Sequence, residues 1–173
     1  MKGCIGYDCF GAGQQVTQSI YFGQTWQSMP EQAKEIFDVF IVVFQLYQIR
    51  YFLLESLTIL PAQVLKSGIK ALIEENEMVC NCEPQNIILF NMENYRSRVN
   101  VLLKQVCGLL QKSLRSENKK CPSDFLGRDF RNKDMRGLDL RDAVFLSQGQ
   151  INSAKGNRNT KLPQYLEYPI TWG

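Results

Sequence analysis

The spacing of apolar residues changes once along this chain, close to residue 120. Up to that point large apolar residues recur every three or four positions, which is the period of an α-helix. From Phe125 to Phe145 they recur at every fifth position instead, which matches neither the helical period nor the two-residue period of a strand. The sequence therefore predicts a helical part followed by a part that turns a corner in every pentad.

The helical part is expected to be a small bundle over residues 29–116. A capping box at residues 28–31 predicts the start of a long helix that is apolar on nearly all sides. A second helix with one apolar stripe is predicted to begin at Pro61, residues 76–84 to form a connection, and a third, amphipathic helix to cover residues 92–116. Three helices of this kind can bury their apolar faces against one another.

The long helix must also be weighed as a membrane span, because residues 36–60 are the most apolar stretch of the chain. A span needs about 20 nearly uninterrupted apolar residues. Polar and charged residues interrupt this stretch repeatedly, which favours a buried central helix and no membrane segment. The interrupting residues are Asp38, Gln45, Gln48, Arg50 and Glu55.

An apolar residue occupies the centre of each of five consecutive pentads. Asp precedes it in four of them, and a residue that tolerates tight turns follows two places after it. With this spacing each central side chain points into a narrow tube, and the residue before it points outward. The residues expected to form this repeat core are Phe125, Phe130, Met135, Leu140 and Phe145.

Residues 123–147 resemble the bacterial pentapeptide-repeat family, whose motif runs small residue, Asp or Asn, Leu or Phe, and two variable residues. The resemblance implies a right-handed quadrilateral β-helix in which four pentads make one coil, so that Phe125 would stack on Phe145 and Leu126 on Leu146. Arg128 and Lys133 stand where the family has a small inward residue, and neither can be buried unpaired at low cost. We therefore expect their side chains to reach outward.

These patterns together predict an α+β fold: a small N-terminal helical bundle followed by about one coil of β-helix and an irregular tail. A single coil buries its faces only against a neighbour, so the bundle must cap it, or a second copy must continue the stack as a homodimer through the exposed coil end. The expected segments are an irregular segment 1–28, the bundle 29–116, a linker 117–122, the repeat coil 123–147 and the tail 148–173.

The absence of histidine argues against catalysis by the common general base and by Ser-His or Cys-His pairs. We assign no catalytic residue, no cofactor and no metal site. A cysteine-only zinc site is disfavoured by the cysteine spacings, and Gly11-Ala12-Gly13 lacks the residues of a phosphate-binding loop. The first residues do not read as a secretory signal, so the six cysteines are expected to be free thiols and the protein cytoplasmic.

Basic residues exceed acidic ones in the pentad region, although the net charge of the chain is only +3. On a square coil the arginines of successive pentads would encircle the tube and alternate with aspartates. This favours a solvated, partly self-paired ring over a nucleic-acid surface. The candidate surface residues are Arg128, Arg131, Lys133, Arg136, Arg141 and, in the tail, Trp172.

The family resemblance implies a non-catalytic interaction protein with a protein partner of unknown identity. Some members are labelled drug-resistance proteins and others protect the target of a drug, so the resemblance also implies such a link. The long acidic rods that imitate DNA differ from this chain in length and charge. The alternative function is binding of anionic ligands or nucleic acid through the basic residues of the repeat region.

Overall fold

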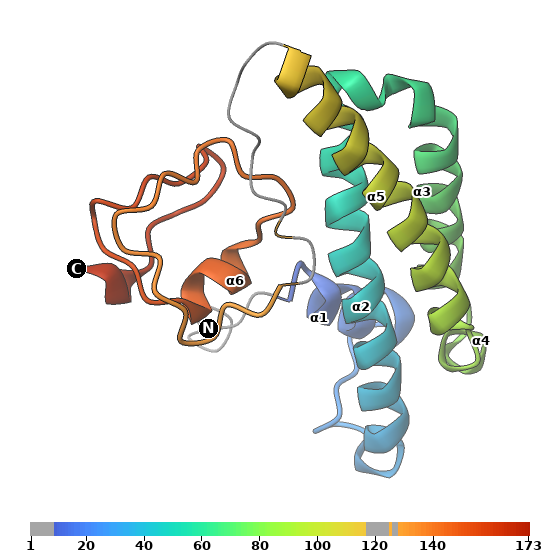
Figure 1. Ribbon diagram of the computed structural model, residues 1–173. Coiled ribbons are helices and arrows are strands. Elements are labelled where there is room, and N and C mark those ends of the chain that lie inside the picture. The colour runs from blue at the N-terminus through green and yellow to red at the C-terminus, as the bar shows by residue number, and fades with distance from the viewer. Residues whose placement is uncertain (1–8, 117–124, 126–127) are drawn as a thin grey trace. The chain divides into compact units, whose positions relative to one another are not determined.

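The computed structural model describes residues 9–116, 125 and 128–173 (Figure 1). The chain divides into two compact units, and each is considered by itself. The helical unit is Cys9–Leu110, and the pentad unit contains the described residues that follow it, 111–116, 125 and 128–173. Lys119, Lys120, Leu126 and the predicted linker lie outside the described residues, as do Cys4 and Cys121.

Three long helices make up most of the helical unit (Figure 1). Shorter turns precede and connect them, and the last helix, α5, continues past the boundary between the units. The elements are α1 (Ala12–Gln14), a π-helical turn (Gln15–Ile20), a 3-10 turn (Pro30–Gln32), α2 (Ala33–Thr58), a second 3-10 turn (Leu60–Leu65), α3 (Lys66–Cys80), α4 (Pro84–Ile88) and α5 (Met92–Ser116).

Helix α2 is the centre of the helical unit, because one side of it is buried along its length. Val39, Val43, Leu46 and Leu53 on this side are fully buried. The residues Pro30–Thr58 have the length and composition of a membrane span, and 33% of their most apolar window is buried in the structure. A core helix of a globular protein meets the same criteria, so this finding assigns no location.

The capping box predicted at residues 28–31 is not formed. Met29 is the N-cap of the turn that leads into α2, and no side chain caps it. The Ser28 hydroxyl instead accepts a hydrogen bond from the Thr25 backbone amide (2.9 Å) and donates to the Thr25 carbonyl (3.0 Å). The Ser28 hydroxyl is therefore bonded within a tight local turn and does not cap the helix.

The predicted α+β fold with a right-handed quadrilateral β-helix is wrong. Among the described residues no β-strand is present, and pairing is limited to two isolated parallel bridges, Asp134 with Lys155 and Asp139 with Lys161. The chain turns directly after each central residue, and Asn132 and Gly137 take left-handed backbone angles there, with φ of 61° and 71°. Each pentad thus presents only about one residue to a neighbour, which is too short for a strand ladder.

The tail runs alongside the pentads and supplies a second, irregular turn. Helix α6 (Gln148–Ser153) begins this turn, and Lys155 then exchanges backbone hydrogen bonds with Met135 (2.7 Å) and Lys133 (2.8 Å). Lys161 does the same with Leu140 (2.7 Å) and Leu138 (2.8 Å). The apolar side chains of both turns form one buried cluster: Phe125, Phe130, Met135, Leu140, Ala143, Leu146, Ile151, Ala154, Leu162, Leu166 and Trp172.

Candidate functional site

Four of the five central residues, Phe125, Phe130, Met135 and Leu140, belong to the buried cluster of the pentad unit, whereas Phe145 is buried outside that cluster. Phe145 is completely buried, and the other four are at most 7% exposed. The Phe125 amide donates to the Val144 carbonyl (3.4 Å), so the chain returns beside its own start after one circuit. The Phe125 ring packs against Phe130 edge-on, with centroids 5.0 Å apart. The four residues of the cluster therefore hold the unit together, and the outward-facing residues are the candidates for function.

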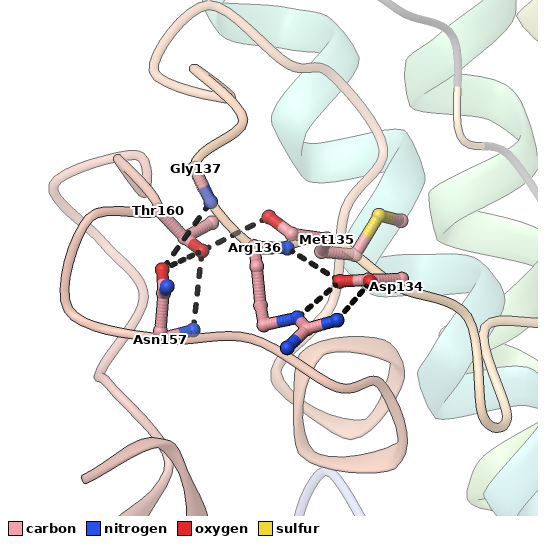
Figure 2. A network of polar contacts seen from close by, with 6 residues as sticks. All are labelled: Asp134, Met135, Arg136, Gly137, Asn157 and Thr160. Carbon is pink, nitrogen blue, oxygen red and sulfur yellow. Dashed lines mark hydrogen bonds and ion pairs between the residues drawn. The ribbon is translucent and has the colours of Figure 1, made fainter.

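Three of the four aspartates that precede central residues, Asp129, Asp134 and Asp139, pair with the arginine two places later. In the pentad of Met135, the Asp134 carboxylate accepts from the Arg136 backbone amide (3.0 Å), from Nε (2.9 Å) and from Nη2 (2.6 Å) (Figure 2). The carboxylate thus caps the turn and binds the guanidinium at the same time. The same arrangement joins Asp129 to Arg131 and Asp139 to Arg141.

These contacts change the acidity of the aspartates. The hydrogen bonds from the arginine side chains lower the pKa of Asp129, Asp134 and Asp139 from 3.8 to about 2. The three pairs are therefore charged at neutral pH, and a phosphate that approached an arginine would compete with a two-point carboxylate contact. The structure brings each of these arginines to the aspartate of its own pentad.

A polar network, buried at Thr160, joins the tail to the pentads (Figure 2). The Thr160 hydroxyl is fully buried and donates to the Met135 carbonyl (2.9 Å). The Asn157 side-chain oxygen accepts from the Gly137 amide (3.2 Å), and Gln150 donates to the carbonyl of Phe125 (3.0 Å). Sequence analysis missed this network, because Asn, Thr and Gln in a polar tail carry no periodic signal.

Trp172 lies in the core of the pentad unit and not on its surface, where the sequence analysis placed it. Its side chain is 2% exposed, and its indole nitrogen donates to the Ala154 carbonyl (3.0 Å). A large aromatic near the end of a chain can fill the open end of an incomplete core, which is its role here. Of the remaining candidates, Arg128 lies over the Phe125 ring (5.9 Å) and Lys133 is exposed.

The helical unit contains a second buried polar network, centred on Asn76. Its amide nitrogen donates to the Leu46 carbonyl (2.9 Å) and to the Tyr95 hydroxyl (3.1 Å), and its oxygen accepts from Arg50 Nε (3.0 Å). The Tyr95 hydroxyl in turn donates to the Leu72 carbonyl (2.8 Å). Sequence analysis missed this network, because it placed Asn76 in the connection after the helix, whereas α3 continues to Cys80 and buries Asn76.

Neither network has the features of a catalytic or metal centre. No group of three or more potential metal ligands is present in the part of the chain that the structure describes. A small cavity of about 130 Å³ lies beside Cys80 and Cys82. Burial raises the pKa of the Cys80 thiol to about 11, which keeps it protonated and weakly nucleophilic at neutral pH.

The chain is similar to a bacterial protein along nearly its whole length. The chain is 29% identical over 216 aligned residues to "Uncharacterized protein YybG" of Bacillus subtilis (strain 168), and the match covers 99% of this chain and 75% of the relative. Because the aligned region is longer than this chain, the relative carries additional residues within it. No protein-family model and no solved structure matches the chain.

Proposed function

We propose that this chain is a non-catalytic interaction protein whose pentad unit presents a fixed surface to a protein partner. The observation that supports this function is the pairing of Arg131, Arg136 and Arg141 with aspartates of their own pentads. Paired in this way, the arginines form a nearly neutral, rigid ring in place of a basic groove for an anionic polymer. Ordered polar surfaces of this kind suit protein contacts, in which geometry gives specificity.

The apolar part of the contact surface is expected in the tail. Ile170 is 95% exposed, and Tyr165 and Tyr168 are about half exposed, with Tyr168 held by a hydrogen bond to the Thr160 carbonyl (2.7 Å). Exposed tyrosines on a rigid support are typical of protein interfaces. The partner is therefore expected to bury Ile170.

The test is site-specific photo-crosslinking in cells. A photoreactive residue at Ile170 should give a discrete adduct with one protein, whereas the same residue at the exposed polar position Asn159 should give none. No adduct at Ile170, or equal adducts at both positions, would contradict the proposal. Retention on heparin or duplex DNA that falls steeply with salt would support the anionic-ligand alternative instead.

The link to drug resistance and the homodimer through the coil end stay separate predictions. Comparing the antibiotic susceptibility of cells with and without the gene tests the first. Sedimentation of the protein at several concentrations tests whether any dimer forms.

A further inference from the structure

Residues 150–155 of the tail run alongside residues 128–133 of the pentads. At one end of this contact the Gln150 side chain donates to the Arg128 carbonyl (3.0 Å). At the other end the Lys155 amide donates to the Lys133 carbonyl (2.8 Å). These contacts bring together the backbones of three exposed basic residues that are not part of the arginine–aspartate pairs. We call them the basic cluster: Arg128, Lys133 and Lys155.

The basic cluster keeps a positive charge when the acidic residues beside it are counted. Asp129 and Asp134 lie within the same stretch, and each binds Nε and Nη2 of the arginine two places later. The hydrogen bonds from these arginines are the largest cause of the lowered pKa of both aspartates, and the attraction of Lys133 and Lys155 is a smaller one. With the two arginines included, five basic residues stand against two acidic ones. They stand against three if Asp124, which lies outside the described residues, is added.

The basic cluster is also connected to the exposed end of the tail. Lys155 directly follows Ala154, whose carbonyl accepts from the indole nitrogen of Trp172 (3.0 Å). Two residues before Trp172 stands Ile170, whose side chain is 95% exposed. The cluster and Ile170 therefore belong to the same part of the pentad unit, so one segment of a partner can contact both.

We propose that the basic cluster binds an acidic segment of the protein partner, while an apolar residue of the same segment covers Ile170. This inference rests on the proposed function and adds the chemistry of the partner. Carboxylates of the segment balance the surplus positive charge, which steers association and fixes the register of the contact. A nucleic acid fits less well, because proteins that bind duplex DNA commonly neutralise about six to ten phosphates. Polybasic segments that bind membranes carry about four to eight basic residues, whereas the cluster has three.

The test compares the binding of two fluorescein-labelled synthetic peptides to the full chain by fluorescence anisotropy. One peptide has glutamates around a leucine and a phenylalanine, and the other has glutamine in place of every glutamate. At physiological salt the acidic peptide should bind on the order of tenfold more tightly, and the difference should shrink as salt is added. This comparison uses the wild-type protein, so it does not depend on the folding of a variant.

Charge reversal locates the binding site. Lys133→Glu combined with Lys155→Glu should remove the preference for the acidic peptide, whereas Lys133→Arg combined with Lys155→Arg should retain it. Lys66→Glu combined with Lys70→Glu is the matched control, because it changes the net charge equally at two exposed positions of the helical unit. Equal binding of the two peptides, no binding of the acidic peptide, or an equal loss in the control would overturn the proposal. Tighter binding of duplex DNA or of phosphatidylserine vesicles than of the acidic peptide would also overturn it.

Photo-crosslinking at Ile170 separates this inference from the proposed function. Mass spectrometry of the adduct should place the crosslinked residue of the partner in an acidic segment. An adduct in a neutral or basic segment would overturn the acidic contact and leave the interaction function standing. The absence of any adduct would contradict both.

Discussion

At the scale of single residues, the aspartates of the pentads combine a structural and an electrostatic role. Each one caps a turn through the backbone amide two residues later and binds the guanidinium of the same residue. The local sequence Asp-apolar-Arg is sufficient to bring these groups together, because the turn itself sets the distance. The exposed pairs therefore form without help from distant parts of the chain.

The lowered pKa values predict how the pentad unit responds to acid. A carboxylate with a pKa of about 2 in the folded protein, against 3.8 ordinarily, stabilises the fold above about pH 4 and loses this effect as the pH falls towards 2. The wild-type unit should lose stability in this window, and a variant with Asn at positions 129, 134 and 139 should lose less. Urea unfolding followed by Trp172 emission, with Trp26→Phe in both proteins so that only Trp172 emits, measures both, and identical pH profiles would contradict the prediction.

Asn76 is the residue on which the buried network of the helical unit depends. Asn76→Ala would leave Arg50 Nε and the Leu46 carbonyl without this partner, and we expect a loss of about 2–4 kcal/mol in the free energy of unfolding. Denaturant unfolding followed by far-UV circular dichroism measures it. Asn100→Ala on the exposed side of α5 is the control, with an expected change below about 0.5 kcal/mol. Equal losses in both variants would refute the role of the network.

At the scale of elements, the tail and the pentads depend on each other. The pentads supply one turn of buried side chains, and α6 with the residues after it supplies the second. Close approach of the tail backbone to Trp172 is part of this arrangement, because a Cβ at Gly156 would lie 2.4 Å from indole carbons. Only glycine fits there while the indole keeps its hydrogen bond to Ala154.

Gly156→Ala is therefore expected to displace the indole of Trp172. Its emission should shift to longer wavelength and become accessible to iodide, and the pentad unit should lose on the order of 1–3 kcal/mol of stability. Gly149→Ala in α6 is the matched control, because the nearest atom to its new Cβ would be 4.0 Å away. An unchanged Trp172 spectrum in Gly156→Ala would show that the tail is packed differently.

At the scale of the whole molecule, each unit has its own buried core. The core of the helical unit includes Val39, Leu46 and Tyr95, and that of the pentad unit includes Met135 and Trp172. Because each core is formed within one unit, the two units are expected to unfold as separate cooperative blocks.

A fragment of residues 9–116 tests this expectation, since it contains the helical unit and all of α5. It should give a helical circular dichroism spectrum and a cooperative thermal transition close to that of the helical unit in the full chain. Asn76→Ala should lower this transition in both proteins, whereas Gly156→Ala in the full chain should leave it in place. A fragment without cooperative unfolding would contradict the independence of the units.

The helices were predictable because the buried residues of a helix recur every three or four positions in the sequence. The structure has α2 and α5 close to the ranges that the apolar spacing indicated. Helix α3 begins later than predicted, at Lys66, and continues to Cys80 through residues that were expected to form a connection. The prediction of a β-helix was wrong. Five-residue spacing defines the turns and the inward positions, but it does not define how many residues form backbone hydrogen bonds with a neighbouring segment. The position of Trp172 was missed because a single aromatic residue in a polar tail has no period.

The sequence by itself determined the local features of this protein: the helical stripes, the turns of the pentads and the pairing of each aspartate with the arginine two places later. These depend on contacts within a few residues, so spacing alone records them. Only the tertiary structure decided that the tail forms the second turn, that Trp172 closes the core and that Asn76 links three helices. Those outcomes depend on which distant segments pack together, and this is determined by the burial of their apolar residues in a shared core.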